Sequence, residues 1–134
     1  MSWNRIWTGA ALAAAVLWFF DLGNLILSQR LLVPEPNLLW GELIPISGSL
    51  VVPSLVGGFL LSWLYALVRP RLGPGPKTAL IMGSVVFALA NPHFFGLTLW
   101  ISSPAAALIQ GLILWLKFAT ATFLAGWQYI EKAP

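Results

Sequence analysis

Residues 6–28 read IWTGAALAAAVLWFFDLGNLILS, an apolar run that a single charged residue, Asp21, interrupts. A helix needs roughly 20 mostly apolar residues to cross about 30 Å of hydrocarbon, because it rises about 1.5 Å per residue. This run is long enough to span a bilayer, and it is too long for the apolar region of a signal peptide. We therefore expect an uncleaved first transmembrane helix over 6–28.

Three further apolar stretches of similar length follow, at about 46–68, 78–100 and 105–128. The chain of 134 residues is 59% hydrophobic and only 8% charged, whereas about a quarter of the residues in a globular domain are charged. Four spans leave only short loops and tails, so no extramembrane domain remains to carry chemistry. The sequence predicts a single all-α domain over 1–134, an integral membrane four-helix bundle in the lipid bilayer.

Basic residues indicate the orientation of the spans, because cytoplasmic loops carry an excess of Lys and Arg. With a cytoplasmic N-terminus, Arg30 falls alone on the outer side and Lys117 lies inside a span. The other basic residues then fall on the inner side: Arg5, Arg69, Arg71, Lys77 and Lys132. We expect both termini in the cytoplasm. The seven basic residues form no stripe or cluster, which argues against a nucleic-acid partner.

Prolines interrupt the helical stretches at several points. Three of them fall in 29–45, which predicts a partly ordered outer loop in the membrane interface rather than a long helix. Pro53 should lie in the first turn of the second helix or kink it, and Pro92 should kink the third. Pro104 suits the first position of the fourth helix, with Ser103 as its N-cap.

The connector between the second and third spans carries the most specific pattern. Residues 63–79 read WLYALVRPRLGPGPKTA, in which three prolines fix φ and predict a stiff turn. The motif Tyr-Ala-x-x-Arg-Pro-Arg-x-Gly-Pro-Gly-Pro-Lys-Thr-Ala resembles the inner connector of small uncharacterised four-span bacterial membrane proteins. This resemblance covers the connector and the four-span layout. It implies a multi-pass protein of the bacterial cytoplasmic (inner) membrane and no particular activity.

Small side chains recur at four-residue spacing on two of the expected helices. Inside lipid, helices are held together by close packing rather than by a hydrophobic drive, and small residues allow that packing. The residues expected at such helix-packing contacts are Ser54, Gly58 and Ser62 on the second helix and Ala107, Gly111, Thr122 and Gly126 on the fourth.

Two ionisable residues lie inside the predicted spans, Asp21 and Lys117. A charge near the bilayer centre costs at least about 2.5 to 3.5 kcal/mol on insertion scales, so such residues tend to be retained for a reason. Asp21 shares a helix face with Asn24, and Lys117 shares one with Gln110. If the first and fourth helices are neighbours, these four residues form one intramembrane polar patch.

Three interpretations of this patch stay open. An ion pair between Asp21 and Lys117 could fix the register of the two helices. The patch could instead bind a small ligand or a proton. In the third interpretation, Lys117 is unpaired and either contacts a partner subunit or extends its ammonium group to the interface.

His93, the single histidine, is a candidate ligand for a tetrapyrrole metal or an ordinary polar residue near the interface. The sequence offers too few ligands for a zinc site, and the absence of Cys removes thiolate sites and dithiol redox chemistry. No Gly-rich phosphate loop, Ser/His/Asp set or pair of carboxylates at catalytic spacing is present. We therefore expect neither an enzyme nor a required cofactor.

The leading functional hypothesis is a non-catalytic membrane protein that acts through helix packing, as an accessory or structural subunit of a larger membrane complex or as a homo-oligomer. Its expected partners are other membrane proteins or a second copy of itself. One alternative is transport of a small solute or proton through the patch of Asp21, Asn24, Gln110 and Lys117. A further alternative is pigment binding through His93.

Overall fold

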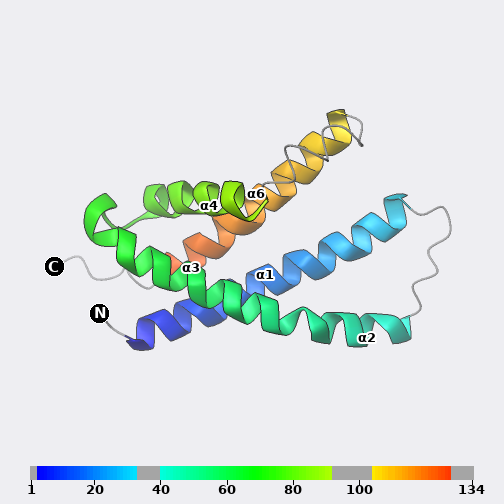
Figure 1. The fold of residues 1–134 in the computed structure, drawn as a ribbon, viewed down its shortest axis with the longest axis horizontal. Coiled ribbons are helices and arrows are strands. Elements are labelled where there is room, and N and C mark those ends of the chain that lie inside the picture. Colours follow the sequence, from blue (N-terminus) through cyan, green and yellow to red (C-terminus); the bar gives the residue numbers. More distant parts are fainter. Residues whose placement is uncertain (1–2, 33–39, 92–103, 128–134) are drawn as a thin grey trace.

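The computed structural model describes residues 3–32, 40–91 and 104–127. Every regular element in these ranges is a helix (Figure 1), so the all-α class is confirmed. The last helix matches the predicted one at 105–128 to within one residue at each end. The helices are α1 (Trp3–Leu32), α2 (Trp40–Ser49), α3 (Val51–Leu72), α4 (Pro76–Ala90) and α6 (Pro104–Trp127).

The first helix, α1, is longer than the predicted 6–28 at both ends. Hydropathy marks where a chain enters and leaves hydrocarbon, whereas a helix continues until a residue breaks it. The first turn already holds a side-chain contact, because the Thr8 hydroxyl donates a hydrogen bond to the Asn4 carbonyl at 2.8 Å. At the other end no proline occurs in the sequence before Pro34, so no proline interrupts the helix up to Leu32. The helix therefore extends past the apolar run on both sides.

The outer loop predicted over 29–45 is wrong at both ends, because α1 continues through Leu32 and α2 makes residues 40–49 helical. Pro34 and Pro36 precede this helix and so do not interrupt it. Pro45 lies inside it and removes a single backbone donor. Three prolines in one segment were therefore a weaker barrier to helix than expected, since only one of them falls within the helical turns.

Together α2 and α3 form an almost continuous apolar span over Ile44–Leu72 (Figure 1). Leu50 joins them with helical dihedrals (φ −79°, ψ −13°), and its N–H donates to the Ile46 carbonyl at 3.2 Å. Pro53 lies in the first turn of α3, one of the two places expected for it. The second predicted helix is therefore present as α3, and the short helix α2 precedes it.

The connector between α3 and α4 is shorter than predicted, because α3 continues through Pro70. Gly73 and Gly75 have positive φ values of 81° and 130°, a backbone conformation that glycine adopts without steric cost. The Gly75 N–H donates to the Tyr65 hydroxyl at 3.2 Å, and the Thr78 hydroxyl donates to the Gly73 carbonyl at 2.7 Å. These bonds hold the end of α3 against the start of α4, as expected of a stiff turn.

The third predicted helix, 78–100, is interrupted, because α4 ends at Ala90 after 15 residues. Asn91 has non-helical dihedrals (φ −126°, ψ 53°). Its φ lies in the range that a following proline favours, whereas its ψ lies outside that range. Its backbone and side-chain amides both donate to the Phe87 carbonyl at 3.1 Å. The described part of the helix therefore ends before Pro92, and the kink predicted there lies outside the described residues.

Three helical segments are long and apolar enough to cross a membrane: Trp3–Ile26, Ile44–Leu72 and Ala107–Trp127. The architecture is that of a helical membrane protein. The described part of the third predicted span is too short to cross, and the rest of it lies outside the described residues. The four-span prediction is therefore not supported, and three candidate spans are found among the described residues.

In the bundle, α1 packs against both α3 and α6, and α4 packs against α6 (Figure 1). The interior is built largely from small residues, and a buried cluster joins Ala13, Leu17, Leu61, Ala121 and Ala125. Many large apolar side chains lie on the outside instead. Small residues inside and large apolar residues outside are the arrangement that lipid as a solvent favours.

Candidate functional site: an intramembrane polar patch

The four residues of the predicted polar patch meet between α1 and α6. Lys117 Nζ forms an ion pair with Asp21 Oδ1. Gln110 Nε2 donates a hydrogen bond to Asn24 Oδ1 at 3.4 Å. The neighbouring arrangement of the first and last helices, on which the prediction depended, is therefore observed, and Lys117 is paired.

The two pairs are consistent with antiparallel helices. Asp21 and Asn24 are separated by about 4.5 Å along α1, and Gln110 and Lys117 by about 10.5 Å along α6, at 1.5 Å per residue. The difference of about 6 Å is taken up by the lysine side chain, which reaches along the helix to the carboxylate. A shorter basic or polar side chain at 117 would leave Asp21 out of reach.

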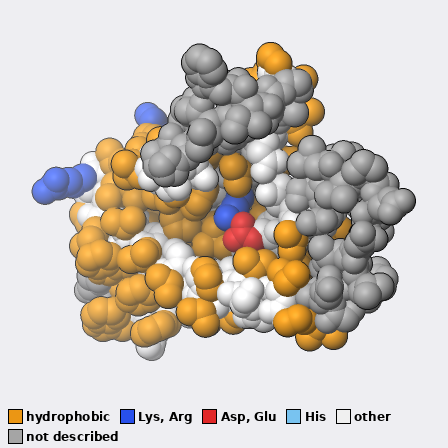
Figure 2. Space-filling view, turned by 45° about the vertical axis from the view of Figure 1, so that its right-hand side comes forward, with side chains coloured by type: hydrophobic (Ala, Val, Ile, Leu, Met, Phe, Trp, Pro, Cys, Tyr) orange, Lys and Arg blue, Asp and Glu red, His pale blue; other side chains and the backbone are white. Residues whose placement is uncertain are grey.

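The patch is not sealed from its surroundings. Lys117 is 14% exposed, and Asp21 is 32% exposed. Figure 2 shows an acidic group beside a basic group in a hollow of an otherwise apolar face. Lys117 Nζ also lies 5.2 Å from the centroid of the Phe118 ring, close enough for a cation–π contact. The two charged groups are therefore paired with each other, and both side chains are also partly exposed at the surface of the bundle.

The two polar pairs can fix the register of α1 against α6. Their exposed atoms can also form hydrogen bonds or ion pairs with a neighbouring molecule. Inside a low-dielectric environment, two opposite charges in contact offset the loss of hydration that each would suffer alone. Removing one partner of such a pair typically costs about 3–5 kcal/mol, because the other charge is left uncompensated. The described residues include no group of three or more His, Cys, Asp or Glu side chains that could hold a metal ion.

The helix-packing residues predicted on the second span are all buried in α3. A Cβ atom added to Gly58 would lie 2.6 Å from the Ala14 nitrogen and would also meet the Ala10 carbonyl, so α1 approaches to backbone contact. The Ser62 hydroxyl donates to the Ile6 carbonyl at 2.9 Å. Ser54, Gly58 and Ser62 therefore bind α3 to α1 within the bundle.

Three of the four packing residues predicted on the last helix are buried: Ala107, Thr122 and Gly126. Gly126 lies against the Tyr65 ring of α3, where an added Cβ would be 2.5 Å from Cζ. Gly111 is half-buried. The buried small residues are used inside one chain, so they do not by themselves indicate a partner protein.

Two interhelical contacts join α4 to α6, and the one at Gly83 was missed by the sequence reasoning. Trp115 Nε1 donates to the Ser84 hydroxyl at 2.9 Å, and the missing side chain of Gly83 lets α4 approach the Ala119 backbone. An added Cβ at Gly83 would lie 2.8 Å from Ala119 Cα. The available signal was the four-residue spacing of Ala79 and Gly83, the same pattern that identified the seam on α3.

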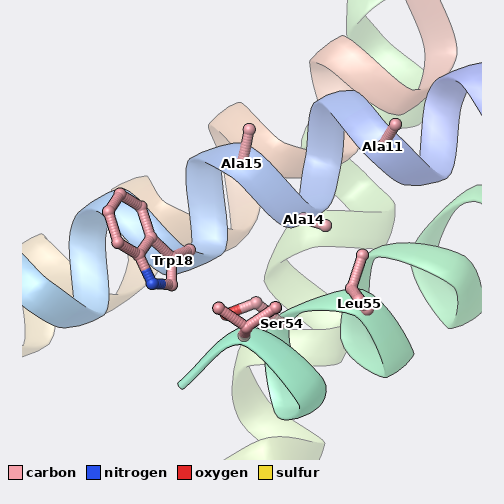
Figure 3. Close-up of a pocket in the computed structure, with 7 residues that line it drawn as sticks. Ala11, Ala14, Ala15, Trp18, Ser54 and Leu55 are labelled. Carbon is pink, nitrogen blue, oxygen red and sulfur yellow. The ribbon is translucent and has the colours of Figure 1, made fainter. Parts of the chain in front are cut away.

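An apolar groove of about 260 Å³ lies between α1 and α3 (Figure 3). Ala11 and Ala14 form its α1 wall beside Trp18, and Ser54 and Leu55 line it from α3. The Ser54 hydroxyl is buried without a hydrogen-bond partner. The lining supplies no charged group, so this groove is a feature of packing rather than a site for chemistry.

His93 lies outside the described residues, and its proposed role as a pigment ligand stays a prediction. Comparisons of the chain with protein-family models, curated proteins and solved structures find no match. Among the described residues, the polar patch between α1 and α6 is the candidate site, because it brings charged and polar side chains of two helices together.

Proposed function

We propose that this chain is a non-catalytic membrane protein that covers its polar patch with another membrane protein, as an accessory subunit of a larger complex or as a homo-oligomer. One observation carries the proposal: Asp21, inside a candidate span, is about one third exposed on the outside of the bundle. Hydrocarbon offers no hydrogen bonds to a carboxylate, so this surface is better matched by protein than by lipid.

The contrast with the rest of the surface supports this choice of contact face. Phe19 is 70% exposed and Leu108 is 74% exposed, and both are satisfied by lipid tails. Ionisable residues within spans almost always face a bundle interior, a partner or a water-filled cavity. Asp21 and Lys117 are the ionisable residues in the described spans that lie away from the ends, so they distinguish this face from the others.

The membrane and the orientation belong to the same proposal. We place the chain in the bacterial cytoplasmic membrane with both termini inside. The connector motif at 65–79 supports the membrane, and the basic residues at one end of the helices support the orientation.

Cysteine-directed photocrosslinking can test this proposal, because the chain has no Cys of its own. Ile109 precedes Gln110 and is 62% exposed, and Leu89 on α4 is 75% exposed. A maleimide–benzophenone reagent is attached to the introduced thiol in membranes, and on illumination it inserts into a nearby C–H bond, so the partner needs no thiol. The labelled Ile109→Cys variant should form an adduct with a partner, while the labelled Leu89→Cys variant should not. A self-adduct of Ile109→Cys identifies a homo-oligomer, and an adduct of different mass identifies a foreign subunit. A monomer in both variants contradicts the proposal.

A transport function is the second candidate, favoured by the alignment of the two polar pairs. Asn24–Gln110 and Asp21–Lys117 follow each other along the helices, so polar groups extend from Lys117 toward the outer end. Proteoliposomes of the Lys117→Leu variant should then lose proton or solute flux while the fold stays intact. Unchanged flux in a folded Lys117→Leu protein excludes this candidate.

A further inference from the structure

A second apolar groove, between α4 and α6, opens onto the outside of the bundle. Its volume is about 260 Å³, and its walls include Pro76, Leu80, Trp115, Leu116, Thr120 and Phe123. We propose that this groove holds one acyl chain of an anionic phospholipid, whose phosphate group is bound by Lys77 and Arg71.

The length of the groove matches one leaflet of a bilayer. Along α6, the walls run from Phe123 to Trp115, about 12 Å at 1.5 Å per residue. Along α4, Pro76 and Ser84 are also about 12 Å apart, and Ser84 accepts a hydrogen bond from Trp115. Half of a hydrocarbon core of about 30 Å is about 15 Å, so an acyl chain entering at Pro76 would end near the bilayer centre.

Positive charge lies at the end of the groove where a headgroup would be. Lys77 follows Pro76 directly, three residues before the groove residue Leu80, and its side chain is exposed. Arg71 is exposed in the last turn of α3, and a connector of only a few residues joins that turn to α4. Hydrogen bonds from Gly75 and Thr78 order the connector between the two basic residues, and Lys77 is adjacent in sequence to the groove residue Pro76.

The connector that carries these two basic residues has no acidic residue near it in the sequence. Residues 44–91, from α2 to the end of α4, contain three basic residues and no Asp or Glu. The mouth of the groove is therefore positively charged, which complements an anionic headgroup.

A phospholipid is the occupant that fits both halves of this site. The groove lies between the candidate span α6 and the shorter apolar helix α4, where acyl chains would be its neighbours. Basic pockets between helices on the cytoplasmic side of membranes bind anionic headgroups. A second protein helix would fill the groove but would leave the basic mouth without a counter-charge. A free phosphate would use the basic mouth but leave the apolar groove empty.

The test is a binding titration of the purified full chain in neutral detergent by native mass spectrometry. Phosphatidylglycerol and phosphatidylcholine with identical acyl chains are compared, because they differ in net charge. Each basic residue near an anionic surface contributes about fivefold in affinity. Phosphatidylglycerol should therefore bind about 25-fold more tightly, and the Lys77→Gln/Arg71→Gln double variant should lose most of that preference.

Two control variants separate this site from general electrostatics. Arg30→Gln removes a charge at the other end of α1 and should keep the preference. Thr120→Phe should fill the groove and weaken both lipids, whereas Thr120→Val has nearly the native volume and should bind normally. Equal affinity of the native chain for both lipids overturns the proposal, as does an unchanged preference in the Lys77/Arg71 double variant. Equal competition by inorganic phosphate would assign the site to a free anion instead.

Discussion

The helix α1 meets its two main neighbours in different ways. Toward α3 it presents small residues, and the backbones approach so closely that Gly58 has no room for a Cβ atom. Toward α6 it presents Asp21 and Asn24, which bind a lysine and a glutamine. The first interface is held by shape, and the second adds charge at a depth where charge is costly.

The α1–α3 interface needs no explanation beyond packing, whereas the ion pair between α1 and α6 does. Close packing of small residues already joins α1 to α3 and α6, through Gly58, Ser62 and Gly9. An apolar pair of similar volume could have completed the contact at Asp21 and Lys117, often without loss of stability. The ion pair is therefore best explained by what it offers to the outside of the bundle.

The largest effect is expected when one charge of the pair is removed. The Asp21→Leu variant leaves the Lys117 ammonium uncompensated, and its free energy of unfolding should fall by about 3–5 kcal/mol. Reversible unfolding in detergent micelles, followed by circular dichroism, measures this change. A variant as stable as the native chain would mean that the pair contributes nothing to the α1–α6 contact.

The packing interface should respond to volume instead of charge. Gly58→Leu forces a side chain against the backbone of α1 and should cost about 1–3 kcal/mol or more. Gly23 lies on α1 with nothing within 4 Å of its added Cβ, so Gly23→Leu is the matched control. Equal stability of these two variants in the same unfolding assay would contradict the close approach of α1 and α3.

A smaller effect is expected for the one hydroxyl that crosses this interface. Ser62→Ala leaves the Ile6 carbonyl without that donor and should cost about 0.6–1.7 kcal/mol, the range found for hydrogen bonds between membrane helices. Ser49 bonds to Ile46 in its own segment and is exposed, so Ser49→Ala should change stability less. If Ser49→Ala proves the more damaging variant, the role assigned to Ser62 is wrong.

Some of this architecture could be predicted from the sequence. Hydropathy located α1, α3 and α6, since it measures the transfer of side chains into hydrocarbon. It did not locate the end of α4, where the backbone of Asn91 leaves the helical conformation one residue before Pro92. It also did not predict α2, because a proline count ignores where each proline falls in a helical turn.

The residues of the candidate site could be predicted from the sequence, but their meeting across two helices could not. Helical spacing placed Asp21 with Asn24 and Gln110 with Lys117, and the reach of lysine made an ion pair plausible on geometry. Spacing along one chain does not say which helices are neighbours, so the meeting of the two pairs required the structure. The partial exposure of Asp21, on which the proposed function rests, is likewise a property of the packed bundle and not of any single helix.

The central claim is that the polar patch exists for a partner rather than for the fold of this chain. The most direct test is the Asp21→Leu/Lys117→Leu double variant, extracted gently from its membranes beside the native chain and sized by native electrophoresis. Because both charges are gone, its free energy of unfolding should stay within about 1 kcal/mol of the native value. The account predicts that the native chain migrates in an assembly and that the folded double variant migrates as a monomer. A double variant that keeps the native assembly would contradict it.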